Sequence, residues 1–342
     1  MDNSFRAARS ELMSETISDL LVVGAGPTGI AIGAEARKAG LSVILIDRGQ
    51  LTDAILNFPT YMTFFTTRDK LEIAGIPLTV PQEKPTRQDA LMYYRAVAAK
   101  YELELGLYEE VLQVRRAGDV FVVSTRSDGH TRERRARAVA LATGYFNQPL
   151  AFTIPGSDLP FVHRYYREPY RHFRENVVLI GGGNSACETA LDLWRNQAGR
   201  VTMVVRGPEL KSGVKYWVRP DVENRISEGS IAAHFNSTVV KIQEHPRGVE
   251  IRDSAGGTQF IPADAVYAFI GFQPDAELER RCGVEVDSVT LVPKFNPETC
   301  ETNVPGLYIA GTIQAGLDTG RIFIENSREH APLIVAAVKA RQ

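Results

Sequence analysis

Two short glycine-rich runs, at residues 24–29 and 181–186, have the residue types and the spacing to bind phosphate groups. Each run follows an apolar segment and precedes a helical pattern. In the first run Gly24 permits a tight bend, Gly26 lets the backbone approach a pyrophosphate, and Gly29 lets the helix pack closely on the strand. The helix N-terminus then presents free N–H groups and a partial positive charge to the phosphate. The sequence therefore predicts two dinucleotide-binding turns in one chain.

The strands that follow the two turns end in side chains of opposite charge. Asp47 closes the strand after the first turn, where a carboxylate can accept hydrogen bonds from ribose hydroxyls. In the second run Ala186 replaces the third glycine, and Arg206 stands where the acid would be, with Lys211 close behind. An arginine there can pair with a 2′-phosphate, which an acid would repel. We therefore expect FAD at the first turn and NADPH, in preference to NADH, at the second.

Composition is that of an ordinary globular protein, with 44% hydrophobic and 23% charged residues among 342. This length leaves room for about two domains. The net charge of −2 gives no overall field for nucleic acid, and the basic run at 126–138 fits a solvated hairpin flank. No apolar run approaches the roughly 18 residues of a membrane span, and no signal peptide is evident. We expect a cytoplasmic enzyme without nucleic-acid or membrane partners.

The periodicity predicts an α/β fold with two Rossmann-like dinucleotide-binding domains, the second inserted into the first. Strand, helix and strand patterns follow one another at 18–47 and again at 176–206. A helix is predicted at 87–100 and a β-meander around 119–126. The expected divisions are a flexible tail at 1–17, an FAD-binding domain at 18–151 and 297–342, and an NAD(P)H-binding domain at 152–296.

The three cysteines, Cys187, Cys282 and Cys300, are far apart and odd in number. This pattern argues against a disulfide framework and against a metal site, and the chain contains no CxxC pair. The six histidines have no metal-ligand spacing either. We therefore expect no metal, and chemistry carried by the organic cofactors.

These motifs, with "ATG" at 142–144 and "TNVPGLYIAG" at 302–311, resemble the two-domain flavoproteins of the thioredoxin-reductase type. Longer stretches, among them "FPTYMTFFTTRDKLEIAGIPL" and "GVKYWVRPDVENRISEGSI", are similar to the YpdA-type bacillithiol disulfide reductase family. The resemblance implies FAD contacts by the residues of the first turn and its surroundings, Gly24, Gly26, Pro27, Thr28, Gly29, Asp47, Gln50, Thr143, Gly144 and Gly311. Together with the pattern of the second turn, the resemblance also implies that NADPH is contacted by Gly181, Gly183, Asn184, Ser185, Ala186, Arg206 and Lys211.

The chain differs from both of these families at the positions where their reactive cysteines would lie. Thioredoxin reductases carry a CxxC ahead of the second turn, where this chain reads "HRYYREPYRHF". Thr28 occupies the flavin-side position that is often cysteine in the narrower family, so it is the candidate catalytic position, although a hydroxyl forms no mixed disulfide. Thr312 follows Gly311 where the wider group has aspartate, and Asp318 comes a few residues later.

The leading interpretation is an FAD-dependent NADPH oxidoreductase that passes a hydride from nicotinamide C4 to flavin N5 and then reduces a low-molecular-weight disulfide such as bacillithiol disulfide. A small redox protein is the alternative partner. Other readings are a ferredoxin- or flavodoxin-NADP reductase, a flavin monooxygenase, and a flavin redox sensor with little turnover. The resemblance implies a homodimer. Aromatic candidates for the nicotinamide or flavin surroundings are His163, Tyr165, Tyr166, Phe64 and Phe65.

Overall fold

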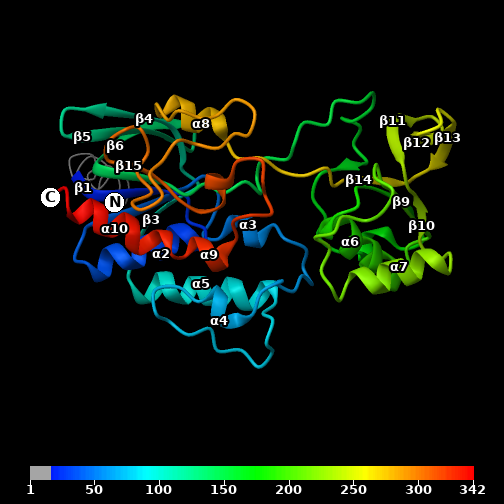
Figure 1. The fold of residues 1–342 in the computed structure, drawn as a ribbon, viewed down its shortest axis with the longest axis horizontal. Helices are drawn as coiled ribbons and strands as arrows, with labels where there is room; N and C mark the ends of the chain where they lie inside the picture. The colour runs from blue at the N-terminus through cyan, green and yellow to red at the C-terminus, as the bar shows by residue number, and fades with distance from the viewer. Residues whose placement is uncertain (1–16) are drawn as a thin grey trace, which may run out of the picture. The chain divides into compact units, whose positions relative to one another are not determined.

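The computed structural model describes residues 17–342, and the predicted tail at 1–17 lies outside the described residues except for Ile17, which begins the first strand. The chain divides into two compact units (Figure 1). Unit 1 comprises residues 17–56, 66–148 and 272–342, and unit 2 comprises residues 57–65 and 149–271. Each unit is built around a sheet with parallel central strands, and one of the two glycine turns follows a strand of each sheet.

The sheet of unit 1 has the strand order β3-β2-β1-β6-β5-β4, with β15 also paired to β6. Strands β1, β2, β3, β6 and β15 run parallel to one another, whereas β4, β5 and β6 form the predicted antiparallel meander. The basic run at 126–138 lies largely on the β5–β6 hairpin, as expected. The strands are β1 (Ile17–Val23), β2 (Val43–Asp47), β3 (Glu104–Leu107), β4 (Glu110–Ala117), β5 (Val120–Ser127), β6 (His130–Leu141) and β15 (Leu307–Ile309).

Helices α2 and α10 lie side by side in unit 1 (Figure 1). The predicted helix at 87–100 is confirmed as α5. It begins there because the Thr86 hydroxyl accepts a hydrogen bond from the Asp89 amide while the Asp89 carboxylate accepts one from the Thr86 amide. The helices of this unit are α2 (Pro27–Lys38), α3 (Asp53–Leu56), α4 (Arg68–Leu71), α5 (Arg87–Lys100), α8 (Ala276–Arg281), the 3-10 helix η2 (Gly311–Ala315), α9 (Ile324–Ser327) and α10 (His330–Lys339).

Unit 2 has a five-stranded parallel sheet of order β10-β9-β8-β14-β7 and a separate three-stranded antiparallel sheet, β11-β12-β13. Both faces of central β8 are buried, since Val177 and Leu179 share a core with the helices, whereas Val178 and Ile180 pack with the three-stranded sheet. The elements are β7 (Val162–His163), η1 (Tyr170–His172), β8 (Asn176–Ile180), α6 (Asn184–Arg195), β9 (Arg200–Val204), α7 (Arg219–Ser227), β10 (Ala232–His234), β11 (Ser237–Glu244), β12 (Arg247–Asp253), β13 (Thr258–Pro262) and β14 (Ala265–Ala268).

The unit boundaries differ from the expected domain boundaries at two places. The chain returns to unit 1 at Phe272, well before the predicted residue 297, because Leu278, Cys282 and Val284 pack into the core of unit 1. Residues 57–65, which were expected in the first domain, group with unit 2. One unit is inserted within the other, as predicted. The boundaries of the insertion, however, are determined by packing between residues that are far apart in the sequence.

Within residues 17–342, no helix combines the length and the apolar character needed to cross a bilayer.

Candidate functional site

The first glycine turn connects the buried end of β1 to the start of α2, and each glycine meets a different demand. Gly24 has a φ of +113°, and a Cβ there would lie 2.3 Å from the Ala142 carbonyl oxygen. A Cβ on Gly29 would lie 1.9 Å from the Gly24 carbonyl oxygen. At Gly26, by contrast, a Cβ would meet nothing within 4 Å. Two glycines therefore serve packing, while the middle one leaves open space over the helix N-terminus.

The N-terminus of helix α2, next to the open space at Gly26, is uncapped. No side chain of residues 17–342 caps it, and its first turn holds no acidic residue. Pro27 is the first helical residue, which suits the fixed φ of proline and loses no intrahelical hydrogen bond. The positive end of the helix dipole and the unbonded N–H groups are thus available to an anion.

Asp47 at the end of β2 is held in place by the turn itself. Its Oδ2 accepts a hydrogen bond from the Ala25 amide at 2.7 Å and its Oδ1 accepts one from the Gly49 amide at 2.8 Å. Burial raises the pKa of Asp47, an effect that these two backbone hydrogen bonds oppose. Each carboxylate oxygen retains acceptor capacity for a ribose hydroxyl.

Three further predicted residues lie beside the first turn because β1, β6 and β15 are adjacent parallel strands. A Cβ on Gly24 would come within 3.3 Å of Thr143 Cα, and a Cβ on Gly311 would come within 3.1 Å of Thr28 Oγ1. Gly144 has a φ of +65°, which favours glycine. Gln50 follows β2 and accepts a hydrogen bond from Arg95 at 3.3 Å. Their cofactor contacts stay a prediction.

Thr28, the candidate catalytic position, bonds to a hydroxyl rather than to a base. Its Oγ1 lies 3.0 Å from Ser327 Oγ, and Ser327 in α9 is buried. Among residues 17–342 no titratable side chain hydrogen-bonds to Thr28. The pair ties the first turn to α9 but offers no activated nucleophile.

The second glycine turn, between β8 and α6, repeats the geometry of the first. Gly181 has a φ of +135°, and a Cβ there would lie 2.5 Å from the Phe269 carbonyl oxygen. Gly183 leads into an uncapped helix N-terminus, and Ala186 is fully buried against the sheet. Ser185 is exposed in the first helical turn. Asn184, however, is engaged within the protein, since its amide nitrogen donates to the Gly213 carbonyl at 2.8 Å.

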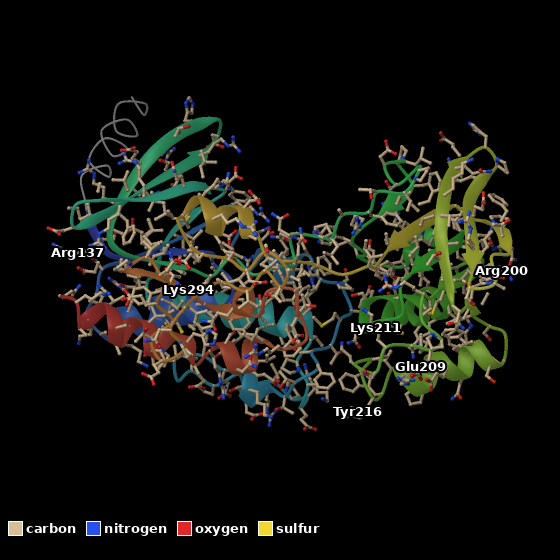
Figure 2. The ribbon with its side chains drawn as sticks, turned by 45° about the horizontal axis from the view of Figure 1, so that its top comes forward. Arg137, Arg200, Glu209, Lys211, Tyr216 and Lys294 are labelled. Carbon is tan, nitrogen blue, oxygen red and sulfur yellow. The ribbon has the colours of Figure 1, made fainter. Side chains whose placement is uncertain are left out.

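Arg206 and Lys211 supply positive charge beside this second turn. Both side chains are exposed, and neither has a carboxylate within 4 Å in the described part of the chain. The Lys211 amide donates to the Gly182 carbonyl at 2.9 Å, and a Cβ on Gly183 would lie 3.7 Å from Lys211 Cδ. Figure 2 shows Lys211 with Glu209 on the segment between β9 and α7. The unpaired cations can therefore bind an anion near α6.

The three cysteines are free thiols, and all are buried. Burial raises the pKa of Cys187 to about 12 and that of Cys282 to about 11, and it also raises the pKa of Cys300. Because the thiolate is the reactive form, none of them is suited to disulfide exchange. Among residues 17–342, no cluster of three or more histidine, cysteine or acidic side chains is placed to hold a metal ion.

Two of the aromatic candidates serve packing in unit 2. Tyr166 is only 3% exposed, lies in the core, and donates its hydroxyl to Asp192 at 2.7 Å, so its proposed place along a nicotinamide path is wrong. Phe65 stacks on Trp217 with ring centroids 5.7 Å apart. Burial lowers the pKa of His163, whose ring lies 5.1 Å from that of Tyr267.

Comparison with known proteins identifies the family. A family model described as pyridine nucleotide-disulphide oxidoreductase matches residues 21–311. The chain belongs to this family. Bacilliredoxin reductase Bdr of Bacillus subtilis (strain 168) is 36% identical over 323 residues, which cover 94% of this chain and 98% of the relative.

Two solved structures of that type match almost the entire chain. Bacillithiol disulfide reductase Bdr (YpdA) from Bacillus cereus superposes with a TM-score of 0.92 at 34% identity, covering 96% of this chain and 100% of the other. The Staphylococcus aureus structure has a TM-score of 0.89 at 34% identity, with coverage of 95% and 99%. The predicted fold class and family are thereby confirmed. The ferredoxin-reductase and monooxygenase alternatives are not favoured, because the three relatives described above, which are 34–36% identical over at least 94% of this chain, carry Bdr names.

As a member of the pyridine nucleotide-disulphide oxidoreductases, the chain is an oxidoreductase that uses a flavin and a nicotinamide nucleotide. Three residues that bond to the predicted site residues were not identified from the sequence. Ser327 pairs with Thr28, the His330 Nδ1 accepts from the Gly311 amide at 3.1 Å, and Lys215 bonds beside the second turn. Each depends on contacts far apart along the chain, for which local spacing gives no signal.

Proposed function

We propose that this protein is an FAD-dependent, NADPH-using reductase. Unit 1 would bind FAD, unit 2 would bind NADPH, and a hydride would pass from nicotinamide C4 to flavin N5. The observation that carries the proposal is the pair of open, uncapped helix N-termini followed by opposite charges, Asp47 after the first and Arg206 after the second. Asp47 is the last residue of β2 and Arg206 lies just beyond the end of β9, and opposite charges near the ends of these two strands favour two different dinucleotides.

The first turn suits FAD. Open space at Gly26 would admit a pyrophosphate to the N-terminus of α2, and the Asp47 carboxylate, which two backbone amides hold beside the turn, would accept hydrogen bonds from a ribose. Thr28, Thr143 and Gly311 would surround the same dinucleotide. Their roles rest on the family resemblance together with their proximity to the turn.

The second turn suits NADPH better than NADH because, among residues 17–342, no acidic side chain pairs with Arg206 or Lys211. A charge-assisted hydrogen bond contributes about 1.5–3 kcal/mol, so Arg206→Ala should raise the KM for NADPH by about 10- to 100-fold. The KM for NADH should change little. Arg200→Ala, at the other end of β9, is the matched control and should leave both values unchanged. Equal loss with both nucleotides would contradict a 2′-phosphate contact.

We propose bacillithiol disulfide, or another low-molecular-weight disulfide, as the acceptor, on the basis of the two Bdr structures. The name of the Bacillus subtilis relative makes a bacilliredoxin, a protein acceptor, the second candidate. Steady-state NADPH oxidation with each acceptor in turn distinguishes them. Since all cysteines are buried, Cys187→Ser should retain turnover with the true acceptor. We further propose a cytoplasmic homodimer, as the family resemblance implies.

A further inference from the structure

Lys215 is a buried cation in unit 2 that the proposed reaction does not use. It is only 6% exposed. Its Nζ lies 2.6 Å from Glu188 Oε1 and donates to the Thr63 carbonyl at 2.9 Å, and the ammonium lies 5.7 Å from the centroid of the Trp217 ring. A buried ammonium is costly unless its donors are satisfied, so these contacts fix Lys215 in one position.

The backbone around Lys215 is bonded to the first residue of α6. Asn184 Oδ1 accepts a hydrogen bond from the Lys215 amide at 2.8 Å, while its side-chain nitrogen donates to the Gly213 carbonyl at 2.8 Å. Glu188, the partner of the ammonium, lies one turn further along the same helix. The loop that carries Lys211 is therefore attached to the second glycine turn by backbone and side chain together.

The third partner, Thr63, belongs to the segment of residues 57–65. Within unit 2 this segment is also held by a hydrogen bond of 2.8 Å from the Thr60 amide to the Arg167 carbonyl and by the stacking of Phe65 on Trp217. Its two ends, however, continue into unit 1. There Arg87 donates to the Leu56 carbonyl at 2.6 Å, and Thr66 donates to Glu325 in α9. The segment is thus connected at both ends to residues of unit 1, while its own contacts are with the elements around the second turn.

We propose that Lys215 is a positioning residue that couples dinucleotide binding at the second turn to the segment 57–65. The coupling rests on the proposed function of that turn. A dinucleotide phosphate on the N-terminus of α6 restrains Asn184 and the loop ending at Lys215, and Lys215 transmits that restraint through its bond to the Thr63 carbonyl. By linkage, an ordered segment strengthens dinucleotide binding to the same extent.

Hydrogen exchange measured by mass spectrometry on the intact flavoprotein, with and without NADP⁺, tests this coupling. In the wild type, NADP⁺ should slow amide exchange both at the start of α6 and in residues 57–65. Lys215→Met should abolish the NADP⁺-dependent slowing in 57–65 while retaining it in α6, and should weaken NADP⁺ binding by about 5-fold or more. Lys241→Met, the same change at an exposed lysine of unit 2, should behave as the wild type.

The outcomes separate three cases. A wild type that does not bind NADP⁺ refutes the proposed function and this coupling with it. NADP⁺ binding that slows exchange in α6 but not in 57–65 refutes the coupling alone, whether or not the variant folds. If Lys215→Met speeds exchange in 57–65 equally with and without NADP⁺, while the NADP⁺-dependent slowing persists, the role of Lys215 is only structural and the proposal is wrong.

Discussion

Glu279 in α8 should make the stability of unit 1 depend on pH. The residue is 1% exposed, and neither carboxylate oxygen has a hydrogen-bond partner in the described part of the chain. Burial raises its pKa from 4.5 to about 8, with a further increase from Asp275 and an opposing effect of Arg280. The thiol of nearby Cys282 remains neutral in this range because burial raises its own pKa to about 11.

The sign follows from the raised pKa. Below pH 4.5 the carboxyl is protonated in both the folded and unfolded states, so its contribution to stability is intact. As the pH rises from 4.5 to 8 only the unfolded state loses the proton, and the folded state is progressively disfavoured. At about 1.36 kcal/mol per pKa unit, this loss amounts to about 3 kcal/mol by pH 7.

Glu279→Gln removes the titration with little change in shape. We expect the variant and the wild type to differ in free energy of unfolding by about 3 kcal/mol more at pH 7 than at pH 4.5, in favour of the variant. Urea unfolding followed by circular dichroism at several pH values measures this. Glu277→Gln, an exposed position on the same helix, is the control. Parallel pH profiles for Glu279→Gln and the wild type would refute the reasoning.

Three other predictions follow from the packing and burial of other residues. Gly29→Ala should lower stability by about 2–3 kcal/mol and release the flavin, because its Cβ would lie 1.9 Å from a backbone oxygen; thermal unfolding and the flavin spectrum report both. In native protein no cysteine should react with a thiol reagent at pH 8, whereas three should react in urea. Glu109→Ala should cost about 2 kcal/mol in urea unfolding, because it leaves half-buried Arg134 without the carboxylate that lies 2.7 Å from its Nη2.

The parts of the fold that depend on local chemistry were predictable from the sequence. The two glycine turns and their flanking strands and helices follow from periodicity and from the positive φ that glycine tolerates at Gly24 and Gly181. The helix at 87–100 follows from the capping pattern of Thr86 and Asp89. These features involve residues within a few positions of one another, where sequence spacing determines geometry.

The parts that depend on contacts between distant residues were not predictable. The prolines at 297 and 305 predict that the chain returns to the first domain there, but the core of unit 1 already includes Leu278 and Val284, so the return lies at Phe272. Residues 57–65 were expected in the first domain, but contacts such as the bond from Lys215 to the Thr63 carbonyl and the stacking of Phe65 on Trp217 associate them with unit 2. Neither the packing of Leu278 and Val284 nor the contacts of residues 57–65 produce a periodic pattern in the sequence.

Anaerobic reduction of the purified protein, followed by its flavin spectrum, tests the central claim most directly. NADPH should bleach the flavin at lower concentration than NADH, and bacillithiol disulfide should then restore the oxidised spectrum without any reactive protein thiol. A flavin that NADPH does not bleach would contradict the reductase function. A bleached flavin that the disulfide leaves unchanged would contradict the proposed acceptor, and the same reduced sample could then be mixed with a bacilliredoxin.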